Sequence, residues 1–141
     1  MRNLLSAPRL LLLVIATAAL SSSATPSELT AAQAAAHPGQ YVHVRATVAN
    51  TRTTRTGYTF ISLEQPRPKC PIEVAVRPER LPNLTRYLQL QPSELTGRVV
   101  LVQGYVQATA KGSTAQIWLD RAPALSVAPL CPSHTRRMVW C

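Results

Sequence analysis

The sequence predicts a mainly β domain built from one small closed sheet and preceded by a short helix. Residues 40–50 alternate between apolar and polar side chains, which is the period of a strand with one buried face. Similar short stretches follow, separated by Pro, Gly and polar residues typical of turns, at 58–63, 72–76, 98–108 and 114–119. Short strands at this spacing favour a sandwich or a small barrel, and a barrel leaves no exposed edge.

Residues 1–24 have the features of a cleavable secretory signal peptide. Arg2 and Arg9 give a positive start, 10–20 is an almost unbroken apolar run, and small residues precede a cleavage point at Ala24. A membrane anchor is the alternative, but the apolar run is shorter than the roughly 20 residues needed to span a bilayer. We therefore expect export to the periplasm or beyond, with no transmembrane segment in the mature chain.

The first elements after the cleavage point are a helix and a strand. Residues 27–36 are expected to form a short helix, because Ser27 can cap the Ala-rich run that follows. The His-Pro-Gly triplet at 37–39 ends this helix. In the strand 40–50, the face expected to be buried carries Val42, Val44, Ala46 and Val48. The polar, basic stretch 50–56 has no core pattern and is expected to be an exposed loop.

The later elements follow the same reasoning. In 58–63, Ile61 and Leu63 are expected to face the core and Phe60 the opposite side, unless a local bulge turns Phe60 inward. In 72–76, Ile72, Val74 and Val76 alternate with Glu73 and Ala75. A short helix is expected within 78–92, with Pro82 in its first turn. A last edge strand is expected around Leu125 and Val127.

Five stretches of the chain resemble the successive strands of an OB-fold (oligonucleotide/oligosaccharide-binding) domain. In order, they are 38–48, 57–63, 72–76, 95–106 and 115–119. The resemblance implies a small five-stranded OB-like β-barrel with a short N-terminal helix and a short helix between strands 3 and 4. The barrel domain is expected to occupy 25–127, followed by a Cys-containing C-terminal tail at 128–141.

The resemblance also implies where a ligand would bind. OB-folds bind ligands across strands 2 and 3, between the loops after strands 1 and 4. In this chain that region would hold the candidate nucleic-acid-binding residues Arg52, Arg55, Tyr58, Phe60 and Lys111. Cations follow the phosphates of a single strand, and an aromatic ring stacks a base for about 1–3 kcal/mol.

The charge balance agrees with an anionic partner. The chain has 15 Lys and Arg against 6 Asp and Glu, which gives a net charge of +9. A basic exported protein can meet single-stranded nucleic acid or another anionic polymer. An Arg-rich composition can also reflect a GC-rich genome. A protein or glycan of the cell envelope is therefore the alternative partner.

Three cysteines follow the signal peptide: Cys70, Cys131 and Cys141. In an oxidising compartment two of them are expected to form a disulfide, and the spacing leaves all three pairings open. These cysteines with His134 could instead supply the mixed N and S ligands that zinc prefers. We favour the disulfide, and we expect neither a metal nor a cofactor.

The sequence offers no convincing catalytic set. His37 and His43 lack a neighbouring nucleophile or carboxylate that would make either a general base. The carboxylates are few and scattered, and a nuclease-like barrel would have to draw on Glu64, Glu73 and Asp120. We expect a non-enzymatic binding module.

Overall fold

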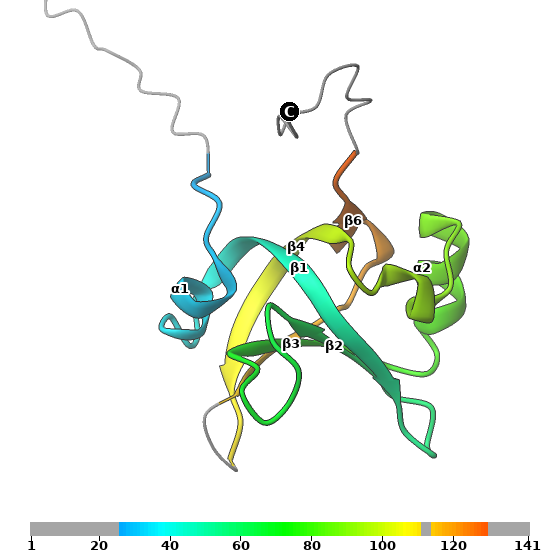
Figure 1. The fold of residues 1–141 in the computed structure, drawn as a ribbon, viewed down its shortest axis with the longest axis horizontal. Helices are drawn as coiled ribbons and strands as arrows, with labels where there is room; N and C mark the ends of the chain where they lie inside the picture. Colours follow the sequence, from blue (N-terminus) through cyan, green and yellow to red (C-terminus); the bar gives the residue numbers. More distant parts are fainter. Residues whose placement is uncertain (1–25, 111–113, 130–141) are drawn as a thin grey trace, which may run out of the picture.

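The computed structural model describes residues 26–110 and 114–129 (Figure 1). The predicted signal peptide at 1–24, Lys111, and the tail from residue 130 lie outside the described residues. The elements, in order, are α1 (Ala31–Ala35), β1 (Tyr41–Thr53), β2 (Thr59–Leu63), β3 (Ile72–Val76), α2 (Leu81–Leu88), the 3-10 turn η1 (Pro92–Leu95), β4 (Val99–Ala108), β5 (Ala115–Trp118), the 3-10 turn η2 (Ala122–Ala124) and β6 (Leu125–Val127).

The strands form the closed barrel that the sequence predicts. Their order is β1-β2-β3-β5-β4, and β4 pairs back with β1 to close the sheet. All neighbours in the barrel are antiparallel except β3 and β5, which are parallel. The short strand β6 pairs with β4 as the expected edge strand.

The long strand β1 takes part in both halves of the barrel (Figure 1). Residues 41–47 pair with β4 and residues 48–53 pair with β2, with an irregularity between Val48 and Asn50 where the partner changes. A bulge of this kind bends a strand. The expectation of a loop over 50–56 is therefore wrong for 50–53. Residues 50–53 have no buried apolar face from which a strand could be predicted. Their backbone nevertheless pairs with β2, and Thr is common in strands.

Gly104 allows β4 to change partners. Residues up to Tyr105 pair with β1, residues 100–102 also pair with β6, and residues from Val106 onward pair with β5. A Cβ atom at Gly104 would lie 2.5 Å from Cγ2 of Ile117, which is too close for any other residue unless the Ile117 side chain moves. This position on the inner face of the barrel therefore favours glycine, which has no side chain.

The core confirms most of the predicted inward faces. Buried side chains include Val42, Val44, Ala46, Val48, Ile61, Leu63, Ile72, Val74 and Val76. The expected alternation in β3 is wrong, however, because Glu73 and Ala75 are buried as well. Both belong to the outer face of the sheet, where other parts of the chain cover them.

The two helices lie on opposite sides of the barrel in Figure 1. Thr30, rather than the expected Ser27, caps α1 in a capping box: its hydroxyl accepts from the Gln33 amide, and the Gln33 side chain accepts from the Thr30 amide. The chain before it is extended, because Leu29 pairs with Val44 of β1. Helix α2 buries Leu84. Within the described ranges, no helix is long and apolar enough to cross a membrane.

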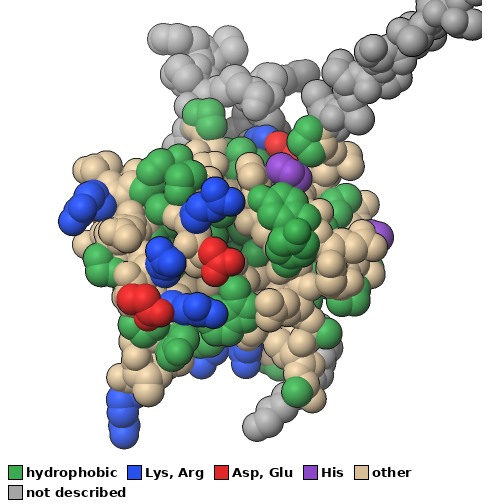
Figure 2. All heavy atoms as spheres, turned by 180° about the vertical axis from the view of Figure 1, so that it is seen from behind, with side chains coloured by type: hydrophobic (Ala, Val, Ile, Leu, Met, Phe, Trp, Pro, Cys, Tyr) green, Lys and Arg blue, Asp and Glu red, His purple; other side chains and the backbone are tan. Residues whose placement is uncertain are grey.

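The surface of the barrel is mixed in character. Seen from behind, Lys and Arg side chains lie among hydrophobic ones, with Asp or Glu beside some of them (Figure 2). The large hydrophobic side chains exposed in the described residues are tyrosines: Tyr41, Tyr58, Tyr87 and Tyr105.

Candidate nucleic-acid interface

Two parallel rows of side chains lie on the outer face of the sheet, and each row runs across the strands. Residues directly paired between strands project from the same face of a sheet. The pairing register defines a first row, which we name the ring row: Arg52, Phe60, Ala75 and Trp118. The second, which we name the ion-pair row, is Asn50, Ser62, Glu73 and Gln116. Residues between the rows, such as Ile61 and Ile117, fill the core.

In the ring row, arginines lie against aromatic rings. The guanidinium carbon of Arg52 is 4.9 Å from the centroid of the Phe60 ring. That of Arg77, just after β3, is 5.5 Å from the centroid of Trp118. Tyr58 meets Trp118 edge to face, with centroids 6.1 Å apart. Cation–π contacts at exposed sites hold a cation by about 0.5–1 kcal/mol, so these arginines are only weakly held.

The β1–β2 turn extends from one end of the ring row. The amide of Gly57 donates to the carbonyl of Thr54, and the amide of Thr54 donates to the carbonyl of Tyr58. Gly57 has a φ of 90°, a conformation that side-chain-bearing residues rarely adopt. This tight turn contains the exposed Arg55 close to the exposed Arg52.

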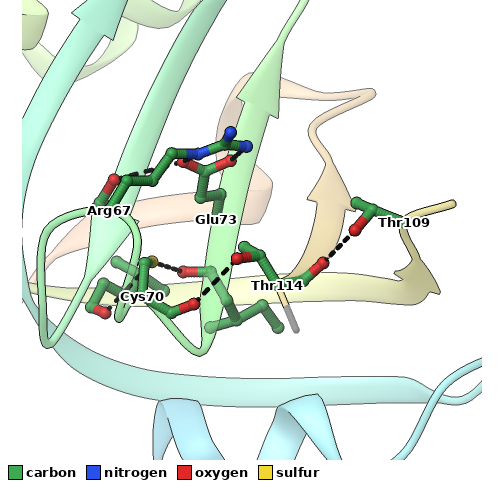
Figure 3. Close-up of polar contacts among 8 residues, drawn as sticks. Arg67, Cys70, Glu73, Thr109 and Thr114 are labelled. Atoms are coloured by element: carbon green, nitrogen blue, oxygen red, sulfur yellow. Dashed lines mark hydrogen bonds and ion pairs between the residues drawn. The ribbon is translucent and has the colours of Figure 1, made fainter. Parts of the chain in front are cut away.

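The loop between β2 and β3 places Arg67 over Glu73 of the ion-pair row (Figure 3). Arg67 donates from Nε to Oε1 of Glu73 at 2.6 Å and from Nη2 to Oε2 at 2.5 Å. The Ser62 hydroxyl also donates to Oε1, at 3.4 Å. The Glu73 side chain is fully buried beneath Arg67, half of whose side chain is exposed. Hydrogen bonding to Glu73 raises the pKa of Arg67 above its usual value, so Arg67 stays charged.

Further hydrogen bonds tie this loop to the neighbouring β4–β5 connection (Figure 3). Thr114 donates its hydroxyl to the carbonyl of Cys70, and Thr109 donates to the carbonyl of Thr114. The buried Cys70 thiol donates to the carbonyl of Ile72 at 2.9 Å. Burial raises the pKa of the Cys70 thiol. A hollow of about 600 Å³ lies between the two connections, with Arg67 and Thr114 among its lining residues.

The structure brings together four of the five residues proposed from the sequence. Arg52 and Phe60 are direct neighbours, Tyr58 lies beside their row, and Arg55 lies in the adjoining turn. Phe60 is half-buried on the outer face rather than turned into the core. The fifth residue, Lys111, lies outside the described residues.

Cys70 is a free, buried thiol in the described part of the chain. Cys131 and Cys141 lie outside it, so the predicted disulfide stays a prediction.

Sequence reasoning missed Trp118 and Arg77. The alternation in 115–118 already placed Trp118 on the face opposite Ile117, which is buried. What the alternation did not reveal is that β5 lies beside β3, which brings Trp118 into register with Ala75. Arg77 follows Ala75 by two residues and therefore projects from the same face.

The described residues offer no ready-made metal site. They contain no group of three or more His, Cys, Asp or Glu side chains placed to hold a metal ion. Of the three carboxylates considered for a nuclease-like barrel, Glu73 is already paired with Arg67.

Comparisons with known proteins point to the same architecture. The chain is similar to OBody AM3L15 bound to hen egg-white lysozyme, with a TM-score of 0.52 and 16% identity over 74% of this chain and 97% of that chain. OBody AM1L10 bound to hen egg-white lysozyme matches with a TM-score of 0.49 and 18% identity over 74% of this chain and 97% of that chain.

The second OB-fold domain of replication protein A from Methanococcus maripaludis matches with a TM-score of 0.39 and 14% identity, over 72% of this chain and 94% of that chain. No family model and no curated protein sequence matches the chain. The likeness to OBody AM3L15 concerns architecture alone, and together with the closed barrel it identifies the described domain as an OB-fold.

Proposed function

We propose that this domain is a non-enzymatic binding module that holds single-stranded nucleic acid across the ring row. The observation that carries the proposal is the repeated pairing of an arginine with an aromatic ring, Arg52 on Phe60 and Arg77 on Trp118. Phe60 lies in β2 and Arg77 directly follows β3, the strands on which OB-folds bind oligonucleotides, while Arg52 and Trp118 lie in the flanking strands β1 and β5.

The chemistry of the ring row suits a flexible polyanion that carries flat bases. Each base has a π face that stacks on an aromatic ring whatever its sequence. A guanidinium plane stacks bases in the same way. An arginine resting on a ring can therefore keep its place and take a base above it, or move aside to a phosphate.

The charges of the ring row are available to a ligand. Neither Arg52, Arg55 nor Arg77 forms an ion pair with a carboxylate in the part of the chain that the structure describes. The nearest buried carboxylate, Glu73, is neutralised by Arg67. After cleavage at Ala24 the chain keeps 13 Lys and Arg against 6 Asp and Glu, and this net charge of +7 adds a long-range attraction for anions.

Together with the signal-peptide features of residues 1–24, this site leads us to propose that the protein meets its ligand outside the cytoplasm. Localisation of a tagged full-length chain by cell fractionation tests this part separately. Recovery of an uncleaved chain in the cytoplasm would contradict it.

The binding proposal is tested by fluorescence anisotropy of the purified protein with labelled oligothymidylate at several salt concentrations. We expect saturable binding that weakens with salt, because each phosphate contact on a single strand contributes roughly 0.7 to the slope of log K against log salt. Arg52→Ala with Arg55→Ala should weaken binding and reduce that slope.

The matched control removes two arginines that lie off the ring row, Arg86→Ala with Arg98→Ala. It lowers the net charge equally. Equal losses from the two double variants would show that only overall charge matters, which contradicts the proposed site. Absence of binding at low salt would refute nucleic-acid binding and favour a protein or glycan ligand.

A further inference from the structure

Two exposed tyrosines lie side by side on the barrel, away from β2 and β3. Tyr41 in β1 pairs directly with Tyr105 in β4. Their rings meet edge to face with centroids 5.1 Å apart. The residues are 51% and 63% exposed, so packing against the core does not account for the two rings.

A hollow links this tyrosine pair to the ring row. It has a volume of about 180 Å³, and Tyr41, Tyr105 and Trp118 all line it. Val106 of β4 pairs with Ile117 of β5. In an antiparallel pair the next positions along the two strands are Tyr105 and Trp118, so these two residues are neighbours beside the hollow. The aromatic side chains thus continue around the barrel from Phe60 through Trp118 to Tyr105 and Tyr41.

The length of this path exceeds that of one stacked base. From β2 to the start of β1 the path crosses β3, β5 and β4, and neighbouring strands lie about 4.8 Å apart, which gives roughly 19 Å. A single OB-fold occupies about 4–16 nucleotides of a single strand. A path of this length is consistent with several nucleotides bound in sequence.

The charges along the path differ from one end to the other. Arg52 lies against Phe60 with Arg55 in the adjoining turn, and Arg77 lies against Trp118. The hollow beside Tyr105 is lined by both Asp120 and Arg121, whose charges cancel. Binding at the tyrosines therefore depends on stacking and not on the attraction of phosphates.

We propose that a single strand bound at the ring row continues across this hollow and stacks a further base on Tyr105 and Tyr41. This inference rests on the proposed function and adds to it a second stacking position with a direction along the barrel. It makes the affinity dependent on ligand length.

The test compares Tyr41→Ala with Tyr105→Ala against wild type, using a thymidine trinucleotide and a dodecanucleotide. We expect the double variant to bind the longer ligand about 5- to 150-fold more weakly, the range for loss of a stacked base. Its affinity for the trinucleotide and the salt slope for both ligands should stay unchanged. The conservative pair Tyr41→Phe with Tyr105→Phe should keep wild-type affinity, because stacking needs only the ring.

Tyr87→Ala is the matched control, because Tyr87 in α2 is 52% exposed and lies off the path. A thermal unfolding midpoint near that of wild type confirms that the double variant is folded. Unchanged affinity for the dodecanucleotide, or equal losses for both ligands, would overturn the second stacking position while leaving the ring row in place. Wild-type protein that binds neither ligand would overturn the proposed function together with this inference.

Discussion

The ring row and the ion-pair row lie next to each other on the same strands. Arg67, which covers the ion-pair row, is held in a different way from Arg52 and Arg77 at the ring row. Arg67 donates two hydrogen bonds to a buried carboxylate. Arg52 and Arg77 rest only on the faces of half-buried rings. This difference determines which arginines a ligand can use. A phosphate would have to displace Glu73 to bind Arg67, whereas at Arg52 and Arg77 it would compete only with a weak cation–π contact.

Arg67→Ala should produce the largest change, and the change should be in stability. It would leave Glu73 without its partner, and we expect the free energy of unfolding to fall by about 2–3 kcal/mol. The loss is smaller than for a fully buried pair, because half of the Arg67 side chain is exposed. Urea denaturation measures it, and Glu73→Gln in the Arg67→Ala background should recover part of the loss.

Arg52→Ala is the counterpart in the ring row. Its effect on unfolding should stay below about 1 kcal/mol, the upper value for an exposed cation–π contact. A loss equal to that of Arg67→Ala would mean that the two rows do not differ in the way described.

Phe60→Ala should weaken oligonucleotide binding by about 1–2 kcal/mol, or roughly 5- to 30-fold. The lower part of the stacking range applies because Phe60 is half-buried. Anisotropy titration measures the change. The control is Ser62→Ala, two residues further along β2 on the same face, and this variant should bind as wild type does. Similar losses from both variants would show that the ligand does not distinguish the rows.

Arg77→Lys should give a smaller effect that separates charge from shape. Lysine keeps the positive charge but lacks the guanidinium plane that stacks on Trp118 and on a base. We expect affinity to fall about twofold to fivefold with no change in the salt slope. A variant that binds as tightly as wild type would show that only the charge of Arg77 is used.

Cys70→Ala should give the smallest of these changes in the pH dependence of stability, and that change should appear only at alkaline pH. Because burial raises the pKa of Cys70 in the folded protein, the unfolded chain loses this proton first as pH rises. Stability from this thiol is thus intact below its ordinary pKa and is lost as pH rises through the folded pKa. Cys70→Ala should lose less stability than wild type between about pH 8 and pH 10 in urea titrations.

The sequence predicted the barrel well, because its strands alternate around a core. The alternate residues Val42, Val44, Ala46 and Val48, together with Ile61 and Leu63, carry this signal, and all six are buried as expected. It failed at 50–53, where β1 extends beyond the core and has no apolar face. It placed Arg52, Tyr58 and Phe60 near one another by resemblance to the OB-fold.

The remaining parts of the site depend on contacts between distant segments. Trp118 joins the ring row through the parallel pairing of β5 with β3, which local alternation does not encode. The Arg67–Glu73 pair depends on the direction taken by a proline-rich loop. Neither can be derived from the periodicity of its own segment.

Trp118 itself offers the most direct measurement. The chain has two tryptophans, so in a Trp140→Phe background Trp118 is the sole one. The account predicts that oligothymidylate quenches its fluorescence with the same midpoint as the anisotropy of the labelled strand, and that salt reverses both changes together. A strand that binds, by anisotropy, while the emission of Trp118 stays constant would place the ligand elsewhere and contradict the ring row as its site.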